Sequence, residues 1–129
     1  MKKLFVSVPM KGRTEEEIKA SIQKMKKIAE IYEGEELELI DSYIEDNPPK
    51  YSKEAVWYLG ESLKKLAKAD VFVGIAEDDD WNGCCVERMT AEKYGLKMYT
   101  VPARYVIDNY YALVIKTHTV SFGKPKITF

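Results

Sequence analysis

The sequence predicts one α/β domain: a three-layer sandwich in which a mostly parallel sheet of four to five strands lies between helices. Short apolar runs rich in β-branched and aromatic residues alternate along the chain with amphipathic segments of helical periodicity. The chain has 129 residues, of which 46% are hydrophobic and 32% charged. That length and composition suit a single globular domain over residues 1–129 rather than a disordered chain or two domains.

The first half of the chain holds two expected strands and two expected helices. Strand Leu4–Val8 comes first, and a helix follows that begins with a capping-box pattern, Thr14 with Glu17, and ends at Gly34. A second strand, Leu37–Asp41, leads through a polar loop with prolines into the next helix. Apolar residues at helical spacing mark that helix: Val56, Leu59, Leu63 and Leu66.

The second half continues the alternation. Its expected elements are a buried strand Val71–Ala76, an acidic loop Glu77–Asp80, a helix from Trp81 to Gly95, a strand Lys97–Val101, a short helix Asp108–Lys116 and a fifth strand Thr117–Phe122. Strands separated by helices join through right-handed crossovers, so the strands are expected to be parallel. The prediction is therefore a flavodoxin-like or Rossmann-like sandwich.

Charge argues against a nucleic-acid polymer as the ligand. The chain carries 20 Lys and Arg against 21 Asp and Glu, a net charge of −1, whereas such binding usually requires a strongly basic surface. The charges are uneven, with a net −5 over residues 1–96 and +4 over residues 97–129. The basic tail is expected to face an acidic rim of this chain or of a neighbouring subunit.

The cysteines and the apolar segments predict a cytoplasmic protein without membrane contact. Cys84 and Cys85 are adjacent, which excludes the disulfide framework of a small secreted protein and points to a reducing compartment. A Cys–His nucleophile is disfavoured because the single histidine, His118, is distant in sequence and is expected to be structural. The apolar run at the N-terminus is interrupted by Pro9 and Lys11, and no stretch is long enough to span a membrane.

Ligands of such sheets bind beyond the carboxyl ends of the strands, which selects residues 7–13, 41–51 and 77–87. In the last segment Gly83 opens a helix whose free N–H groups favour anions. Glu87 lies near that helix mouth, where the helix dipole is expected to keep its carboxylate ionised as a nucleophile. Alternatively, Glu87 is an ordinary acidic residue that offsets the dipole.

The turn after the first strand is the second candidate. Gly12 lies between the cations Lys11 and Arg13 just before a helix, a pattern suited to a phosphate or the edge of a nucleobase. A tight turn with two solvated cations is the alternative. The turn lacks the P-loop pattern, which excludes nucleotide hydrolysis of that kind. The substrate-binding candidates of this turn are Ser7, Pro9, Met10, Lys11 and Gly12.

The acidic run and the second helix supply further candidates. Glu77–Asp80 is interpreted as metal ligands, as a source of a general acid, or as a solvated loop, and neither a metal nor a cofactor is expected. Trp81 is placed either against a base or sugar or in the core. Asn82 joins Gly83 at the helix mouth, and Ser62 lies on the second helix near its apolar stripe.

Three short motifs carry a family resemblance: strand–Pro-Met-Lys-Gly at 9–12, Ala-Asp-Val-Phe-Val at 69–73, and Gly-x-x-x-Glu at 83–87. Together they resemble the nucleoside 2-deoxyribosyltransferase superfamily over roughly residues 3–101. The resemblance is strongest to a branch of small bacterial and phage proteins related to the deoxynucleoside-monophosphate N-glycosidases. It implies that Glu87 attacks the anomeric carbon of a deoxyribosyl group and expels the base through an oxocarbenium-like transition state.

The resemblance also marks departures. Ser62 stands where the family has an aspartate eight residues before Asp70. Trp81 stands where transferases have an aspartate six residues before the nucleophile, and Asp80 is the candidate substitute. Lys11 matches a cation of the N-glycosidases, whereas Pro9 replaces a serine near their phosphate.

Two functions follow from the sequence. The first is an N-glycosidase or 2-deoxyribosyltransferase that acts on a small nucleoside or nucleotide through Glu87, with Asp80 assisting. The second is a catalytically silent nucleotide-binding or sensor module that uses the same pocket. A homo-oligomer, a dimer or larger, is expected because family members complete the pocket from a neighbouring subunit and because the segment after Pro102 is rich in large apolar groups.

Overall fold

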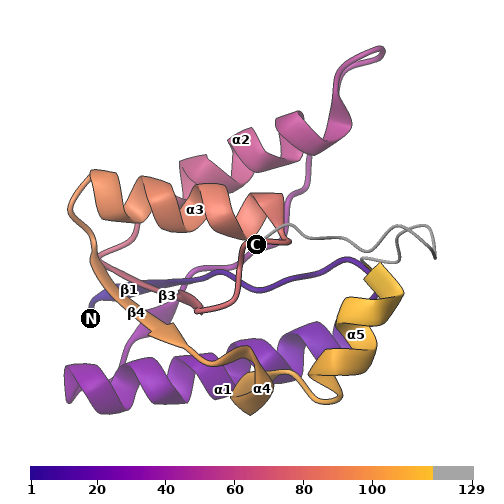
Figure 1. The fold of residues 1–129 in the computed structure, drawn as a ribbon. Helices are drawn as coiled ribbons and strands as arrows, with labels where there is room; N and C mark the ends of the chain where they lie inside the picture. Colours follow the sequence, from indigo (N-terminus) through magenta and orange to yellow (C-terminus); the bar gives the residue numbers. More distant parts are fainter. Residues whose placement is uncertain (118–129) are drawn as a thin grey trace.

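The computed structural model describes residues 1–117 and contains a four-stranded, all-parallel sheet in the order β2-β1-β3-β4 between two helical layers (Figure 1). The strands are β1 (Lys3–Val6), β2 (Glu38–Leu39), β3 (Val71–Ile75) and β4 (Lys97–Val101). The helices are α1 (Glu15–Glu33), α2 (Glu54–Leu66), α3 (Asn82–Lys93), α4 (Ala103–Val106) and α5 (Tyr110–Thr117). The predicted three-layer α/β fold is confirmed.

Helices α2 and α3 cover one face of the sheet, and α1, α4 and α5 cover the other (Figure 1). Side chains of β1 alternate between these faces, as the pleat requires. Leu4 and Val6 join the large core against α1, while Phe5 joins the smaller core with Leu66 of α2. The rings of Phe5 and Phe72 stack at a centroid distance of 6.0 Å on this second face.

Helix α1 begins and ends where the sequence predicts. The Thr14 hydroxyl accepts from the Glu17 N–H at 3.1 Å, and the Glu17 carboxylate accepts from the Thr14 N–H at 2.8 Å, so the capping box is complete. Gly34 ends the helix with φ 73°, a left-handed conformation that a side chain would strain.

The topology places the switch point of the sheet between the carboxyl ends of β1 and β3. Strand β1 leaves the sheet toward α1 on one face, and its neighbour β3 leaves toward α3 on the other. Ligands of open parallel sheets bind at such a switch point. The Ser7 N–H donates to the Val73 carbonyl at 2.9 Å, so the chain stays beside β3 for one residue past β1. Ser7 therefore lies at the switch point.

The end of the chain differs most from the prediction. Helix α4 was not predicted; it forms because Ala103 and Val106, three residues apart, both pack into the core. The predicted helix 108–116 is present as α5. Thr117 was expected to begin a fifth strand but is the last residue of α5, and the rest of that strand, with His118, lies outside the described residues.

Within residues 1–117, no helix is both long enough and apolar enough to cross a bilayer.

Candidate functional site

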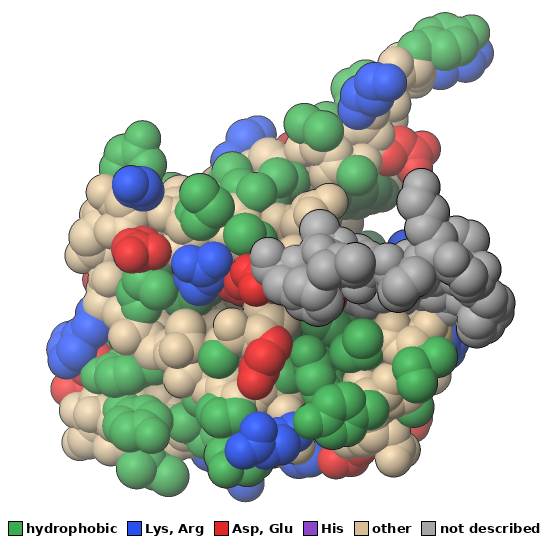
Figure 2. Space-filling model, in the orientation of Figure 1, with side chains coloured by type: hydrophobic (Ala, Val, Ile, Leu, Met, Phe, Trp, Pro, Cys, Tyr) green, Lys and Arg blue, Asp and Glu red, His purple; other side chains and the backbone are tan. Residues whose placement is uncertain are grey.

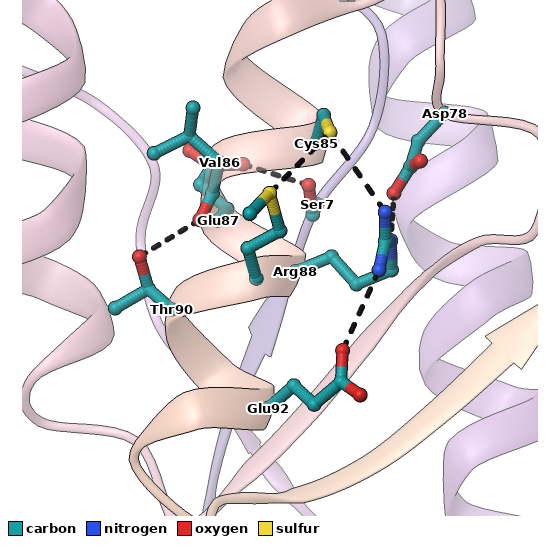
Figure 3. Close-up of polar contacts among 9 residues, drawn as sticks. Ser7, Asp78, Cys85, Val86, Glu87, Arg88, Thr90 and Glu92 are labelled. Atoms are coloured by element: carbon teal, nitrogen blue, oxygen red, sulfur yellow. Dashed lines mark hydrogen bonds and ion pairs between the residues drawn. The ribbon is translucent and has the colours of Figure 1, made fainter.

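The carboxylate of Glu87 lies at the predicted carboxyl end of the sheet, between two hydroxyl groups from distant parts of the chain. The Ser7 hydroxyl, just past β1, donates to Glu87 Oε1 at 2.7 Å. The Ser62 hydroxyl of α2 donates to Glu87 Oε2 at 2.5 Å. Figure 3 shows Ser7 facing Glu87 across the start of α3. Both carboxylate oxygens are thus held in one orientation by three elements.

Burial decides the electrostatics of Glu87. It raises the pKa of the carboxyl group above its ordinary value, and the hydrogen bonds from Ser62 and Ser7 oppose that rise in part. Helix α3 begins at Asn82, so Glu87 is in its second turn, where the helix dipole has weakened. The expectation that the dipole holds Glu87 ionised therefore gives way to burial as the stronger influence. Among the described residues, both partners of Glu87 are uncharged hydroxyls.

Arg88, the next residue, points to the other side of α3. Its Nε donates to Asp78 at 2.5 Å, and Asp78 is only 2% exposed (Figure 3). The Asp78 carboxylate raises the pKa of the Arg88 guanidinium, as expected for a hydrogen-bonded ion pair. This pair ties the loop after β3 to α3 and directs the guanidinium away from Glu87.

Within the acidic run Glu77–Asp80, Glu77 and Asp78 have structural partners. The Glu77 carboxylate accepts from the Ala103 N–H at 2.8 Å and so begins α4. Burial raises the pKa of the Tyr110 phenol, and the negative charges of Glu77 and Asp80 raise it further. Asp80 is the residue predicted as a catalytic acid. No carboxylate of the described chain contributes to the pKa of Glu87. Nor do residues 1–117 contain a cluster of three or more His, Cys, Asp or Glu suited to a metal ion.

Trp81 belongs to the core, so its predicted contact with a ligand is replaced by the alternative. It is 7% exposed and packs against Tyr110 with ring centroids 6.2 Å apart. Its neighbours Asn82 and Gly83 are exposed at the start of α3. The first turn of α3 contains no acidic residue, and Trp81 supplies no side-chain cap. The helix mouth at Asn82 and Gly83 is therefore exposed and has no side-chain cap, and its preference for an anion stays a prediction.

The turn after β1 differs from the predicted phosphate cradle. Arg13 is turned inward, where its guanidinium donates to the Pro9 carbonyl at 3.0 Å, to the Glu17 carbonyl at 3.1 Å and to the Ser21 hydroxyl. The capping box and three first-turn glutamates of α1, residues 15–17, make the nearby helix end unfavourable for an anion. Of the cation pair, Lys11 alone extends outward.

The remaining residues of that turn are partly covered by the protein itself. Pro9 is fully buried, whereas Met10 is 48% exposed. The Lys116 ammonium donates to the Gly12 carbonyl at 3.0 Å, and a Cβ on Gly12 would lie 2.7 Å from the Thr117 side chain. Gly12 is therefore required for the close packing of α5, besides its φ of 76°.

Two residues of the site escaped the sequence analysis. Cys84 is 6% exposed beside Ser7, and burial raises the pKa of its thiol to about 12, so it is a wall of the site and not a nucleophile. Gly74 faces Ser7: a Cβ there would lie 3.8 Å from the Ser7 Cβ and 2.9 Å from the Phe72 ring. A glycine after three apolar strand residues was the one available signal.

The remaining predicted segment, residues 41–51, lines cavities whose lining does not include Glu87. One cavity of about 350 Å³ lies on the α1 side of the sheet. It is lined by Val6, Lys19, Ile22, Gln23, Leu39, Ile40, Asp41 and Ser42. Val6 and Ser7 project to opposite faces of β1, so this cavity and the Glu87 carboxylate are on opposite sides of the sheet.

Searches of protein-family models, curated proteins and solved structures find no match to the chain.

Proposed function

We propose that the chain is a nucleoside or nucleotide N-glycosidase, or a 2-deoxyribosyltransferase, that uses Glu87 as its nucleophile. The observation that carries this proposal is a partly buried carboxylate at the switch point of a parallel sheet, oriented through both oxygens by hydroxyls at 2.7 and 2.5 Å. The motif resemblance assigns the same residue this role. Within the described chain no cation neutralises the carboxylate, which leaves its charge available to a developing oxocarbenium ion.

The chemistry follows from this orientation. Ser7 and Ser62 each occupy one lone pair of the carboxylate, so a remaining lone pair can be aimed at the anomeric carbon. Attack breaks the bond to the base and forms a glycosyl ester on Glu87. Water then releases the sugar in a hydrolase, and a second base does so in a transferase. Asn82 and Gly83 at the mouth of α3, with Met10 and Lys11 of the first turn, form the proposed substrate-binding surface.

The direct test is Glu87→Gln, which keeps the size of the side chain and can still hydrogen-bond to both serines. Release of free base from ribo- and deoxyribonucleosides and their monophosphates, measured by mass spectrometry, should fall by about 10³-fold or more. Glu92→Gln, an exposed glutamate on the same helix, is the matched control and should retain activity. Unchanged base release by Glu87→Gln would exclude the covalent role.

A silent nucleotide-binding or sensor module is the second candidate. Ser62 and Trp81 stand where acids are expected, and Trp81 lies in the core, which favours binding without efficient base departure. This function predicts that a nucleotide raises Tm without any base release. It also predicts that Glu87→Gln leaves the Tm shift intact.

A homo-oligomer and a cytoplasmic location complete the proposal. Tyr105, Tyr111 and Ile115 of α4 and α5 are 61, 72 and 71% exposed, and Figure 2 shows apolar side chains on this layer between charged ones. Light scattering coupled to gel filtration tests the oligomer, with a monomer as the contrary result. Both described cysteines are free thiols, which supports a reducing compartment.

A further inference from the structure

The fate of the departing base separates two classes of N-glycoside. A neutral base leaves with an extra electron pair and becomes an anion unless an acid protonates it, and such an acid contributes about 10²–10⁴-fold to the rate. A cationic heteroaromatic ring leaves as a neutral molecule, because the electron pair of the broken bond cancels its charge. A site without an acid therefore discriminates between the two classes.

The described groups that contact the Glu87 carboxylate are poor acids. Its two hydrogen-bond donors are the hydroxyls of Ser7 and Ser62, and the thiol of Cys84 lies beside them with a pKa of about 12. Neither an alcohol nor such a thiol protonates a departing base effectively near neutral pH. Residues 1–117 place no carboxylic acid against this carboxylate.

The carboxylates closest in sequence have other partners. Glu77 accepts from the backbone of α4 at 2.8 Å, and Asp78 is paired with Arg88. Asp80 acts on the phenol of Tyr110, which belongs to the layer on the opposite side of the sheet from α3. Recruiting Glu77 or Asp78 as the acid would require the loop after β3 to give up these contacts.

The negative charge of the Glu87 carboxylate also favours a cationic aglycone. A carboxylate that loses water without gaining a cation is unfavourable, and a positively charged ligand compensates it. Arg88, the cation adjacent to Glu87 in sequence, is directed to Asp78 instead (Figure 3). A cationic aglycone would therefore be attracted by the same carboxylate that attacks its sugar.

We propose that Ser62 makes this site selective for N-glycosides whose aglycone is a cationic heteroaromatic ring, such as an N-alkylated purine or a pyridinium; this inference rests on the proposed function. A Glu87 oxygen forms a bond to C1′ as the C1′–N bond breaks, and the electron pair of that bond passes to the ring and neutralises it. Water then attacks C1′, the Glu87 carboxylate departs, and one proton enters the solvent.

The test compares 7-methylguanosine with guanosine, which differ by one methyl group and one positive charge, and adds nicotinamide riboside as a pyridinium probe. Base release is measured by liquid chromatography after subtraction of the release without protein. Wild type should favour 7-methylguanosine over guanosine in kcat/KM by about 10²-fold or more.

Two variants of Ser62 identify its role. Ser62→Asp places a second carboxyl group beside Glu87, and since two adjacent carboxylates share a proton, one of them becomes an acid. It should reduce the kcat/KM ratio by about 10-fold or more, through a gain on guanosine. Ser62→Asn, similar in size but without an acidic proton, should keep the wild-type ratio. Circular dichroism verifies that both variants fold.

The outcomes separate this inference from the proposed function. Similar kcat/KM values of wild type for the two purine nucleosides, both lost in Glu87→Gln, would overturn the selectivity and leave the glycosidase standing. A ratio that Ser62→Asp leaves unchanged would overturn the role of Ser62. Absence of release from all three probes by folded wild type would overturn the inference and the glycosidase together. If Ser62→Asp does not fold, the wild-type ratio and Ser62→Asn decide the selectivity.

Discussion

Two glutamates, Glu33 and Glu87, lie at opposite ends of the sheet, and their carboxylates have different neighbours. Glu33, the last residue of α1, receives the Lys97 ammonium at 3.0 Å, the Tyr99 hydroxyl at 2.9 Å and the Lys2 ammonium at 3.4 Å. These partners lower its pKa, with Lys97 the largest influence. In the described chain Glu87 accepts hydrogen bonds from two hydroxyls, and burial raises its pKa.

The comparison shows that neighbouring groups determine the pKa and the contacts of two side chains of the same type. At the amino end of the sheet, two cations and a phenol neutralise a carboxylate that joins α1 to β4 and to the segment before β1. At the carboxyl end, a carboxylate is oriented without being neutralised. An uncompensated, oriented charge opposes folding and favours catalysis, a trade-off common at functional sites.

The largest expected effect separates the two glutamates by activity. Glu87→Gln should lose about 10³-fold or more of the base release, because the proposed mechanism requires a carboxylate oxygen of Glu87 to attack C1′. Glu33→Gln should retain the wild-type rate per folded molecule, since its carboxylate is at the far end of the sheet. Active-site titration or a folded-fraction measurement normalises both rates. Equal losses would mean that Glu87 acts only through stability.

The second-largest effect is expected from a steric change near Glu87. Gly74→Ala brings a Cβ to 2.9 Å from the Phe72 ring, and the ring or the strand must shift. Overpacking of this kind costs about 1–3 kcal/mol. Because Val73, the preceding strand residue, accepts from the Ser7 N–H at 2.9 Å, a shift of the strand also moves Ser7, and base release should fall beyond the loss of folded protein. Urea denaturation and kinetics measure the two effects. A stable variant with full activity would contradict the packing of this face against the site.

Glu87→Gln should also stabilise the fold, in contrast to most substitutions of buried polar residues. The pKa of Glu87 is raised in the folded state, so protonation of this carboxyl group stabilises the fold. That stabilisation is complete below the ordinary glutamate pKa and is lost as the pH rises through the folded pKa. At pH 7 the neutral glutamine removes this penalty, a gain on the order of 1 kcal/mol. Tm against pH should be flatter for the variant. A lower Tm at pH 7 would contradict the sign.

Glu33→Gln should give the smallest effect, of opposite sign. The folded pKa of Glu33 is lowered, so its stabilisation is present above the ordinary glutamate pKa and is lost as pH falls through the folded value. The decrease in Tm at pH 7 should be slight, because Lys2 and Lys97 are 48 and 58% exposed and water screens both pairs. Wild type and variant should converge in acid.

Much of the fold could be predicted because its determinants are local. The Thr14–Glu17 capping box, Gly34 and the apolar spacing of α1 specify that helix without reference to the rest of the chain. The apolar run at 71–75 specifies a buried strand, and parallel pairing follows from the intervening helices. Helix α4 was missed because its four residues depend on a core contact and on the distant carboxylate of Glu77.

The site was predictable in position and less so in its contacts. Placing Ser7 and Glu87 at the same end of the sheet required only strand polarity, and the structure brings them within 2.7 Å. The inward turn of Arg13 departs from both interpretations of its turn, and the burial of Trp81 selects the core over a contact with a ligand. Each outcome depends on packing of α1, α4 or α5 that periodicity does not encode. The packing of the helical layers determines whether a cation is exposed to solvent and whether a tryptophan can contact a ligand.

The sequence by itself determined the order of strands and helices as far as β4 and the end of the sheet at which polar residues gather, since both follow from local periodicity and chain direction. Only the tertiary structure decided that Glu87 would meet Ser7, 80 residues away, and Ser62, 25 residues away, while Arg88 turned to Asp78. The physical reason is that a carboxylate's charge state depends on burial and on its nearest donors, and both arise when the layers pack.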